Sequence, residues 1–263
     1  MDDFLLQVST NHSARIAIKL EDRQRYRRKL MIDIHNHTLY GVDDGPDTIE
    51  ESIQMLKTAK KQGIDAIILT PHYRHGMFSY PKERIEAHFE KLEEEADTIG
   101  IGLYLGCEYH VGSQVAEHMQ SGRCHTLADS DYVLTEYSYE SEYSKVVQNT
   151  QKLINCGYIP VIAHAERYRC FFTAPERCEE MQEIGALIQL NADSVLGKEG
   201  WGISRFCKKV LKNQWADVIA SDAHNMEDRS NHLGECRTYV VKKYGHEYAD
   251  DLFNKNPLKM IHH

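Results

Sequence analysis

Seven short apolar runs, separated by longer amphipathic or charged stretches, restrict the folds that this 263-residue chain can adopt. Strands that alternate with helices pair in parallel through right-handed crossovers. Helices then cover the sheet, so each strand is apolar along its whole length. The seven expected strands are residues 30–34, 64–70, 102–107, 131–135, 159–163, 186–190 and 216–221.

These runs predict an α/β fold with a single domain, in the form of a distorted TIM-like (β/α)7 barrel that is closed or nearly closed. An open, doubly wound sheet is the alternative. Capping residues, Gly stops and apolar periodicity place the helices between the strands and after the last one. The expected helices are residues 48–62 (capped by Asp47 or Thr48), 81–98, 111–119, 143–156, 175–184, 202–213, 232–244 and 247–253.

The two ends and the charge balance exclude several classes of protein. Residues 1–30 are polar, end in the basic run 23–29 and lack a secretory signal, so we interpret them as an N-terminal extension whose order is left open. The domain is expected to span residues 31–257. No apolar run is long enough to span a membrane. The net charge of -9, with no basic face, argues against nucleic-acid binding.

Seven cysteines without Cys-x-x-Cys spacing indicate reduced thiols, and we expect a cytoplasmic location. A cysteine-based tyrosine phosphatase needs an Arg six positions after its nucleophile. None of the seven cysteines has one. The chain therefore does not carry that chemistry.

Polar residues that follow the strands are the candidate functional residues, because the carboxyl ends of parallel barrel strands meet at one face. His35 and His37 are spaced i, i+2, so their side chains point the same way from an extended backbone. A polar residue after a strand has a simpler explanation, since loops begin there. That explanation weakens across six strands that share His, Asp and Glu. The candidates are His35, His37, His72, Glu108, Glu136, His164, Asp222 and His224.

This many nitrogen and oxygen ligands, with no Cys among them, are too many for one ion. They suit two or three divalent cations bridged by a carboxylate. Imidazole and carboxylate ligands suit Mn, Fe or Zn, and the lack of thiolate argues against a structural zinc site. Asn191, which follows the sixth strand, is expected to have a structural or supporting role.

In this order, the candidates resemble the polymerase and histidinol phosphatase (PHP) superfamily. The chain is more closely similar to the manganese-dependent tyrosine phosphatases of bacterial capsule and exopolysaccharide synthesis, found mainly in Gram-positive bacteria. The resemblance covers residues 31–257. Its motifs are residues 33–37, 42–46, His72 with 76–78, 162–168, 220–225 and Arg229.

The resemblance implies a PHP fold that holds two or three divalent ions, with Mn²⁺ expected and Fe or Zn left open. The first ion would be held by His35, His37, Glu108 and Asp222. The second would share Glu108 and add Glu136 and His164. The third would use Asp44, His72 and His224.

The resemblance also implies a phosphatase that hydrolyses phosphotyrosine, and we hypothesise attack by a metal-bound hydroxide. Arg167 and Arg229 follow ligand motifs, and a guanidinium fork matches two phosphate oxygens. A salt bridge to a loop carboxylate is the alternative role for each, and Arg74 is a third candidate. The implied partner is a phosphotyrosine protein, namely a bacterial tyrosine kinase of polysaccharide synthesis. The oligomeric state is left open.

Two other functions remain open at this point. One is a PHP-type phosphatase for a small phosphoester such as histidinol phosphate. The other is a regulatory binding module that keeps its metals for stability.

Overall fold

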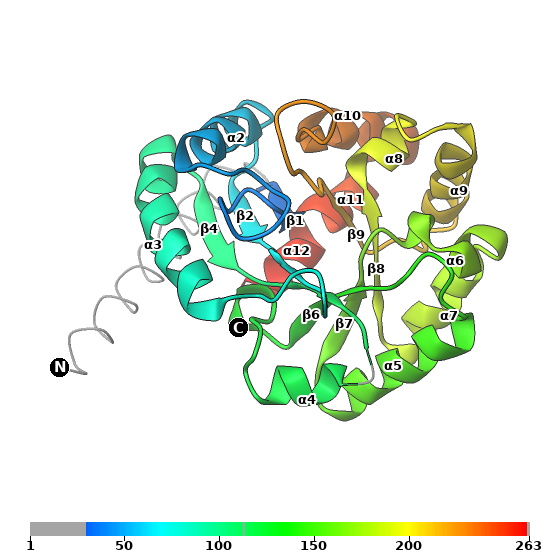
Figure 1. Cartoon of the computed structure of the whole chain (residues 1–263). Coiled ribbons are helices and arrows are strands. Elements are labelled where there is room, and N and C mark those ends of the chain that lie inside the picture. Colours follow the sequence, from blue (N-terminus) through cyan, green and yellow to red (C-terminus); the bar gives the residue numbers. More distant parts are fainter. Residues whose placement is uncertain (1–29, 113, 262–263) are drawn as a thin grey trace.

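The computed structural model describes residues 30–112 and 114–261 (Figure 1), and its named strands pair in parallel. Almost all of the proposed N-terminal extension, residues 1–29, lies outside the described residues. The strands are β1 (Ile32–Asn36), β2 (Ala66–Leu69), β3 (His72–Tyr73), β4 (Gly102–Leu105), β5 (Glu108–His110), β6 (Tyr132–Glu136), β7 (Ile159–Ile162), β8 (Leu187–Asn191) and β9 (Val218–Ala220).

There are nine strands, two more than expected, because the expected strands 64–70 and 102–107 are each followed, after a break, by a short strand beyond their predicted ends, β3 and β5. The first break falls at Pro71, which has no backbone N–H to donate. The second falls at Gly106, where an added Cβ would lie 2.9 Å from Leu127 and 3.0 Å from Ile68. The matching halves still pair, β2 with β4 and β3 with β5. Each broken pair therefore acts as one continuous, bent pair of barrel strands.

The sheet curls until its first and last strands meet. The strand orders are β1-β2-β4 and β3-β5-β6-β7-β8-β9. A parallel bridge between Asn36 and Ala223 joins the chain after β9 to the end of β1. The His37 N–H donates to the Ala223 carbonyl at 2.9 Å, and the Asp222 N–H donates to the His35 carbonyl at 2.9 Å. The predicted distorted (β/α)7 barrel is confirmed, and an open sheet does not describe this arrangement.

Helices surround the sheet in Figure 1, and most lie where the sequence predicts them. Thr48, rather than Asp47, caps α2 in a reciprocal capping box with Glu51. The expected helix at 111–119 is shorter, and the one at 247–253 continues into a π-helical turn. The helices are α2 (Ile49–Lys61), α3 (Lys82–Ile99), α4 (Val115–Gln120), η1 (Leu127–Asp129), α5 (Tyr143–Asn155), η2 (Ala165–Arg167), α6 (Arg169–Thr173), α7 (Arg177–Ile184), α8 (Ala192–Leu196), α9 (Trp201–Lys212), α10 (Leu233–Tyr244), α11 (His246–Asp250), η3 (Asp251–Lys255) and α12 (Asn256–Lys259).

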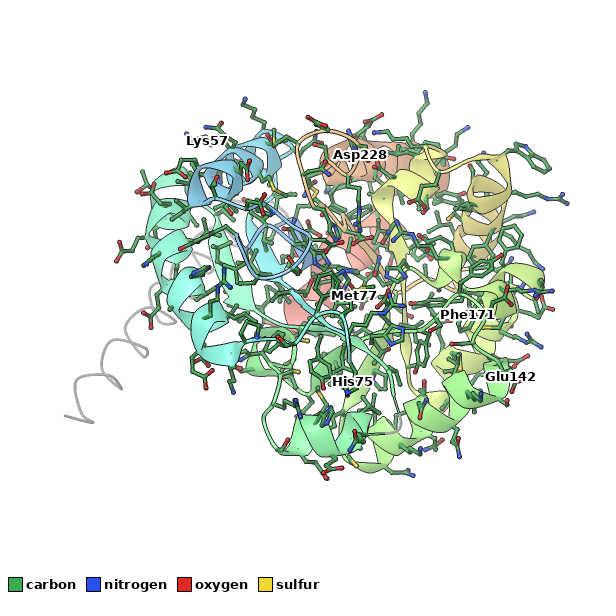
Figure 2. The ribbon with its side chains drawn as sticks, viewed as in Figure 1. Lys57, His75, Met77, Glu142, Phe171 and Asp228 are labelled. Atoms are coloured by element: carbon green, nitrogen blue, oxygen red, sulfur yellow. The ribbon has the colours of Figure 1, made fainter. Side chains whose placement is uncertain are left out.

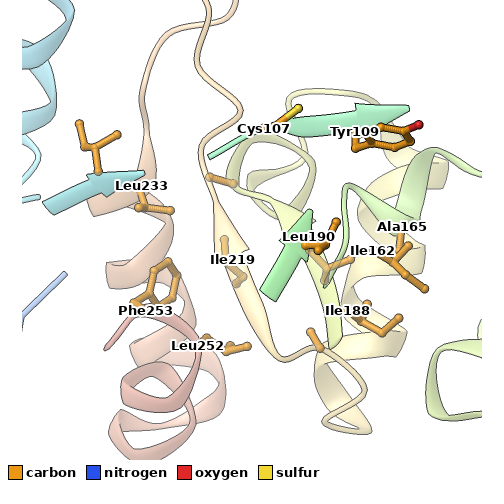
Figure 3. Close-up of a cluster of buried hydrophobic side chains, with 14 of the residues drawn as sticks. Cys107, Tyr109, Ile162, Ala165, Ile188, Leu190, Ile219, Leu233, Leu252 and Phe253 are labelled. Atoms are coloured by element: carbon orange, nitrogen blue, oxygen red, sulfur yellow. The ribbon is translucent and has the colours of Figure 1, made fainter. Parts of the chain in front are cut away.

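Alternate residues of the strands belong to two apolar clusters. Ile67 and Ile219 pack with the helices in the larger cluster, part of which Figure 3 shows. Ile68, Leu134 and Val161 pack with other strand residues in a smaller cluster inside the barrel. Charged side chains such as Lys57 and Glu142 lie on the periphery in Figure 2. Among the described residues, no helix has both the length and the apolar character needed to cross a bilayer.

Leu134→Ala is expected to lower the free energy of unfolding by about 3 kcal/mol, because the side chain is fully buried inside the barrel and its removal leaves a cavity. Trp201→Ala is the control, because Trp201 is 77% exposed and its loss should change stability by less than about 0.5 kcal/mol. Urea unfolding followed by circular dichroism measures both. Equal stability of the two variants would contradict the proposed interior packing.

Candidate metal centre

A cavity of about 300 Å³ opens at the carboxyl ends of the strands. Residues from β3, β5 and β6 and from the loops after β1, β7 and β9 line it, so segments far apart in the sequence meet there. Met77 lies over this central region in Figure 2. The lining residues are Asp44, His72, Arg74, Met77, Phe78, Glu108, Glu136, His164, Arg167, Asp222 and Arg229.

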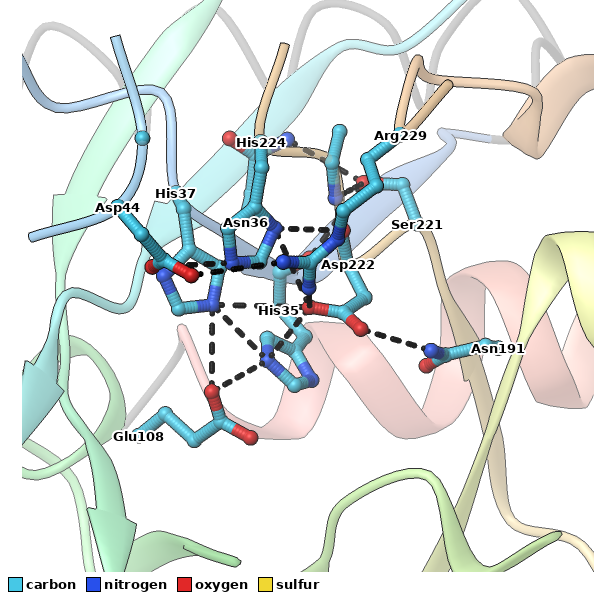
Figure 4. Close-up of polar contacts among 12 residues, drawn as sticks. His35, Asn36, His37, Asp44, Glu108, Asn191, Ser221, Asp222, His224 and Arg229 are labelled. Atoms are coloured by element: carbon cyan, nitrogen blue, oxygen red, sulfur yellow. Dashed lines mark hydrogen bonds and ion pairs between the residues drawn. The ribbon is translucent and has the colours of Figure 1, made fainter. Parts of the chain in front are cut away.

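Beneath the cavity, four buried side chains converge, from His35, His37, Glu108 and Asp222 (Figure 4). The Nε2 atoms of the two histidines lie 3.2 Å apart. The Glu108 Oε2 atom lies 3.1 Å from His35 Nε2 and 3.2 Å from His37 Nε2. The Asp222 Oδ1 atom lies 3.4 Å from His35 Nε2. The structure thus brings together the four residues that the resemblance assigns to the first ion.

Asp43 determines which His37 nitrogen faces this cluster. Its Oδ2 atom lies 2.8 Å from His37 Nδ1 and also accepts the backbone N–H of His72 at 3.1 Å. Burial raises the pKa of Asp43, but His37, His72 and the Gly45 N–H together lower it below its usual value, so the carboxylate is ionised and accepts a hydrogen bond from His37 Nδ1. The Nε2 atom of His37 then faces Glu108. Sequence reasoning missed this role, although Asp43 directly precedes a candidate ligand.

Two further groups of potential ligand atoms adjoin the first. One contains His37, Asp44, His72 and His224; the other contains His72, Glu108 and Glu136. His72 Nε2 and His224 Nε2 each lie 3.4 Å from Asp44 Oδ1. The set that the resemblance implies for the third ion therefore gathers in one place, with His37 added.

The group around Glu136 differs in one member from the set implied for the second ion. His72 joins Glu108 and Glu136 there, with its Nδ1 atom 3.0 Å from Glu108 Oε2. His164 instead contacts Glu108 through Nε2, 2.7 Å from Oε1. Every residue predicted to bind metal still lies in this connected cluster.

The donor set fits divalent cations. Among the described residues, Glu136 Oε2 is a buried atom without a hydrogen-bond partner, and buried polar atoms rarely lack one. Glu108 Oε2 and His224 Nε2 are also buried and lie near charged groups of the cluster, but their contacts do not have hydrogen-bond geometry. Burial lowers the pKa of His35, but Glu108 and Asp222 outweigh it and raise that pKa to about 9. Burial, followed by the charge of Glu108, raises the pKa of Glu136 to about 7. The cluster therefore favours added positive charge.

Two residues of the cluster have a left-handed backbone. His164 has a φ of 33°, and Asp222 has a φ of 54°. This region is unfavourable for residues with a Cβ, and its cost is met by the surrounding structure. Such strain is concentrated in functional sites. Both residues lie at the point where the chain leaves a strand and turns over the cavity.

Arg167 and Arg229 lie at the rim of the cavity, and about a third of each side chain is exposed. Arg167 donates to Asp222 Oδ2 at 2.8 Å and to Glu199 Oε1 at 2.7 Å. Arg229 donates to Asp222 Oδ1 at 3.2 Å. Both form the salt bridges named as the alternative role, yet both line the cavity. Sequence reasoning missed Glu199.

The two remaining candidates are not members of the three groups of potential metal ligands. Asn191 donates from Nδ2 to Asp222 Oδ2 at 2.8 Å, which agrees with a supporting role. Arg74 lines the cavity.

Comparisons with known proteins agree with this architecture. A solved structure of an organophosphorus hydrolase from Deinococcus radiodurans matches with a TM-score of 0.60 at 12% identity, over 88% of this chain and 92% of that chain. A likeness at this identity concerns the fold alone. It places the chain among the TIM-like barrels, which house their sites at the carboxyl ends of the strands.

The family model for capsular polysaccharide synthesis proteins, CpsB/CapC, matches residues 31–262, and the chain belongs to this family. It is 34% identical to the tyrosine-protein phosphatase CpsB of Streptococcus pneumoniae, over 88% of this chain and 98% of that protein. It is 31% identical to the tyrosine-protein phosphatase YwqE of Bacillus subtilis, over 82% and 86%. A crystal structure from work on YwqE and CpsB, described as unique metal-dependent tyrosine phosphatases, matches with a TM-score of 0.78 at 30% identity, over 83% and 90%. The resemblance stated from the sequence is confirmed.

Proposed function

We propose that this chain is a metal-dependent protein-tyrosine phosphatase. Relatives named tyrosine-protein phosphatase are between 30% and 34% identical to it over the aligned residues. The observation that carries the proposal is the convergence of three groups of His, Asp and Glu side chains beside two arginines in one cavity. That combination suits hydrolysis of a phosphate monoester.

The proposed metal ligands are those of the sequence prediction. Two or three divalent ions, with Mn²⁺ as the expected metal and Fe or Zn as alternatives, fit the nitrogen and oxygen donors. When bound, such ions supply water of lowered pKa and neutralise phosphoryl oxygens. Within the protein, Glu108 has the central position, because its carboxylate contacts His35, His37, His72 and His164. Glu108 would therefore belong to the ligand sets of both the first and the second ion.

We propose that Arg167 and Arg229 bind and orient the phosphoryl group. Each guanidinium is partly exposed at the cavity, so it can offer N–H groups to two phosphate oxygens while it stays paired with Asp222. Because Asp222 lies between them, the carboxylate holds the two guanidinium groups on the same side of the cavity.

The turn from Arg74 to Phe78 supplies apolar surface for the tyrosine ring. The N–H of Arg74 donates to the Phe78 carbonyl at 2.9 Å, so the turn closes on itself at the cavity rim. The Phe78 ring stacks on His72 at 5.0 Å, and Met77 is 64% exposed. A thioether against an aromatic ring is favourable. We propose that this turn favours phenyl phosphates over alkyl phosphates.

Met77→Ala is expected to lower kcat/KM for a phosphotyrosine peptide by up to about tenfold, since sulfur–aromatic contacts are worth about 0.3–1.5 kcal/mol. Hydrolysis of histidinol phosphate, which has an alkyl ester, should change little. Met226→Ala is the control, because Met226 is 45% exposed and does not line the cavity. If Met77→Ala lowered kcat/KM equally for both substrates, the turn would have no role in the preference for phenyl phosphates.

Removal of metal is the decisive test of the proposed function. The full chain is treated with a chelator and dialysed, and hydrolysis of a phosphotyrosine peptide, p-nitrophenyl phosphate and histidinol phosphate is measured. Activity should vanish and return on addition of Mn²⁺, with Fe²⁺ and Zn²⁺ compared in parallel. Full activity without metal, confirmed by elemental analysis, would reject the proposal.

The same assay separates the two alternatives. A small-phosphoester phosphatase would turn over histidinol phosphate faster than the peptide. A binding module would turn over none of the three. For the enzyme we expect His35→Ala to abolish hydrolysis while circular dichroism shows a folded protein.

A tyrosine kinase of capsular or exopolysaccharide synthesis is the proposed substrate, and a cytoplasmic location is part of the same proposal. The support is the family's link to capsular polysaccharide synthesis. The test is loss of phosphotyrosine from the purified, autophosphorylated kinase. Persistence of the phosphate with active enzyme would exclude that substrate.

A further inference from the structure

The strand β8 contributes no residue to the three groups of His, Asp and Glu side chains that could hold metal ions. Two of its side chains nevertheless connect residues of those groups. Gln189 is fully buried, and Asn191 is 2% exposed. Both side chains point to the same face of the strand, two residues apart. Their amides form a chain of hydrogen bonds that runs from His35 to Asp222.

The first link has a defined direction. Gln189 Oε1 accepts the backbone N–H of His164 at 3.0 Å, and a peptide N–H can only donate. The same oxygen lies 3.0 Å from His35 Nδ1. Because an amide oxygen only accepts, Nδ1 carries a hydrogen and donates a hydrogen bond to it. Because Nδ1 is the donor to Gln189, Nε2 is the His35 nitrogen that faces Glu108 and His37 and that a metal ion could bind.

The other end of the chain has a defined direction too. Asn191 Nδ2 lies 2.8 Å from Asp222 Oδ2, and an ionised carboxylate only accepts. The Asn191 Oδ1 atom is therefore the acceptor for Gln189 Nε2, at 2.8 Å. The N–H of His164 and the carboxylate of Asp222 thus fix the same orientation of both amides, and the chain is consistent along its whole length.

We propose that Gln189 and Asn191 are positioning residues for the metal ions. Gln189 selects the His35 tautomer that leaves Nε2 for metal, and it ties down His164 at its strained, left-handed backbone. Asn191 holds one oxygen of Asp222, which turns the other oxygen towards His35. This inference rests on the proposed function, because it assigns a role in holding the metals that the function requires.

The test measures metal binding directly. The full chain is stripped with a chelator, and the Kd for Mn²⁺ is measured by isothermal titration calorimetry. Gln189→Leu keeps the size of the side chain but loses every hydrogen bond, and it should weaken Mn²⁺ binding by about 10–100-fold, as other outer-shell substitutions do. Asn191→Leu removes the hydrogen bonds to Gln189 and Asp222 but leaves those of Gln189 to His35 and His164. It should weaken Mn²⁺ binding by about tenfold. If Gln189→Leu does not fold, the Kd of Asn191→Leu for Mn²⁺ tests the proposal in its place.

Gln182→Leu is the matched control. Gln182 lies on the helix α7 and donates from Nε2 to Asp217 Oδ2 at 2.9 Å. Neither residue lines the cavity. Its loss affects stability without touching a metal ligand, so the Kd for Mn²⁺ should not change. Gln189→Glu adds a conservative test, because a carboxylate still accepts from His35 and His164. It should bind Mn²⁺ more tightly than Gln189→Leu.

The outcomes separate the two proposals. If the wild type binds Mn²⁺ and Gln189→Leu binds it equally well, the positioning role is refuted while the proposed function stands. An equal loss in Gln182→Leu also refutes it, because the effect would then be general destabilisation. If the wild type binds none of Mn²⁺, Fe²⁺ or Zn²⁺, the proposed function fails and the positioning role fails with it.

Discussion

Glu108→Gln is expected to lower kcat for a phosphotyrosine peptide by about a thousandfold or more. The carboxylate is fully buried and lies within 3.2 Å of four imidazole rings. An amide has the same size, but it carries no charge and offers one acceptor oxygen in place of two. Stabilisation of the transition state by a metal ion is worth several kcal/mol, and each 1.36 kcal/mol is a factor of ten in rate.

The measurement combines steady-state kinetics with elemental analysis of the purified variant. Bound metal should fall together with kcat, because the residue is proposed to belong to the ligand sets of two ions. Glu183→Gln is the matched control, since Glu183 is exposed on α7 and should leave both quantities unchanged. A Glu108→Gln variant with wild-type kcat would remove the basis for placing metal chemistry at this cluster.

The sequence predicts the ends of the strands well because parallel strands leave a clear apolar pattern. Each of the seven expected strands overlaps observed strand residues. The breaks at Pro71 and Gly106 were harder to predict. The apolar run continues into Leu69 and Leu105 up to each break, and the bend depends on contacts between neighbouring strands that no local pattern records.

Residues proposed to bind metal are easier to predict from sequence than the residues that orient them. His35 and His37 stand at a strand end with a spacing that brings their rings together. Gln189 lies in the middle of an apolar strand and shows its role only through His35 and His164, which are distant in sequence. A buried polar side chain within such a strand is nevertheless a signal, because it needs a partner.

Glu199, the carboxylate that pairs with Arg167 at the rim, was missed for a related reason. Glu199 belongs to the turn between α8 and α9, where an acidic residue is ordinary. Its importance follows from its hydrogen bond to Arg167, which needs the chain after β7 and the chain after β8 to meet. Only the three-dimensional structure shows that these two segments lie side by side.

The second large effect is expected for Arg167→Lys, which should lower kcat/KM for a phosphotyrosine peptide by about 100-fold. Lysine keeps the charge but loses the planar fork that can hold two phosphate oxygens while it stays paired with Asp222. Hydrogen bonds to charged groups are worth about 1.5–3 kcal/mol each, which corresponds to about one to two factors of ten in rate.

Glu199→Gln tests how Arg167 is held. The neutral amide still accepts a hydrogen bond from the guanidinium but no longer attracts its charge, so KM should rise by about threefold to tenfold while kcat stays close to the wild-type value. Steady-state kinetics with the same peptide separate the two constants. A fall in kcat alone would contradict a role in binding the phosphoryl group.

Arg169→Lys is the matched control for Arg167→Lys. Arg169 lies two positions after Arg167 and is 63% exposed. Among the described residues, its guanidinium forms an ion pair with Glu140 alone, at 2.9 Å. Elemental analysis must accompany both variants, because Arg167 also contacts Asp222. If both variants keep their metal and only Arg167→Lys loses kcat/KM, the guanidinium of Arg167 binds the phosphoryl group. Wild-type kcat/KM in that variant would instead restrict Arg167 to the salt bridges with Asp222 and Glu199.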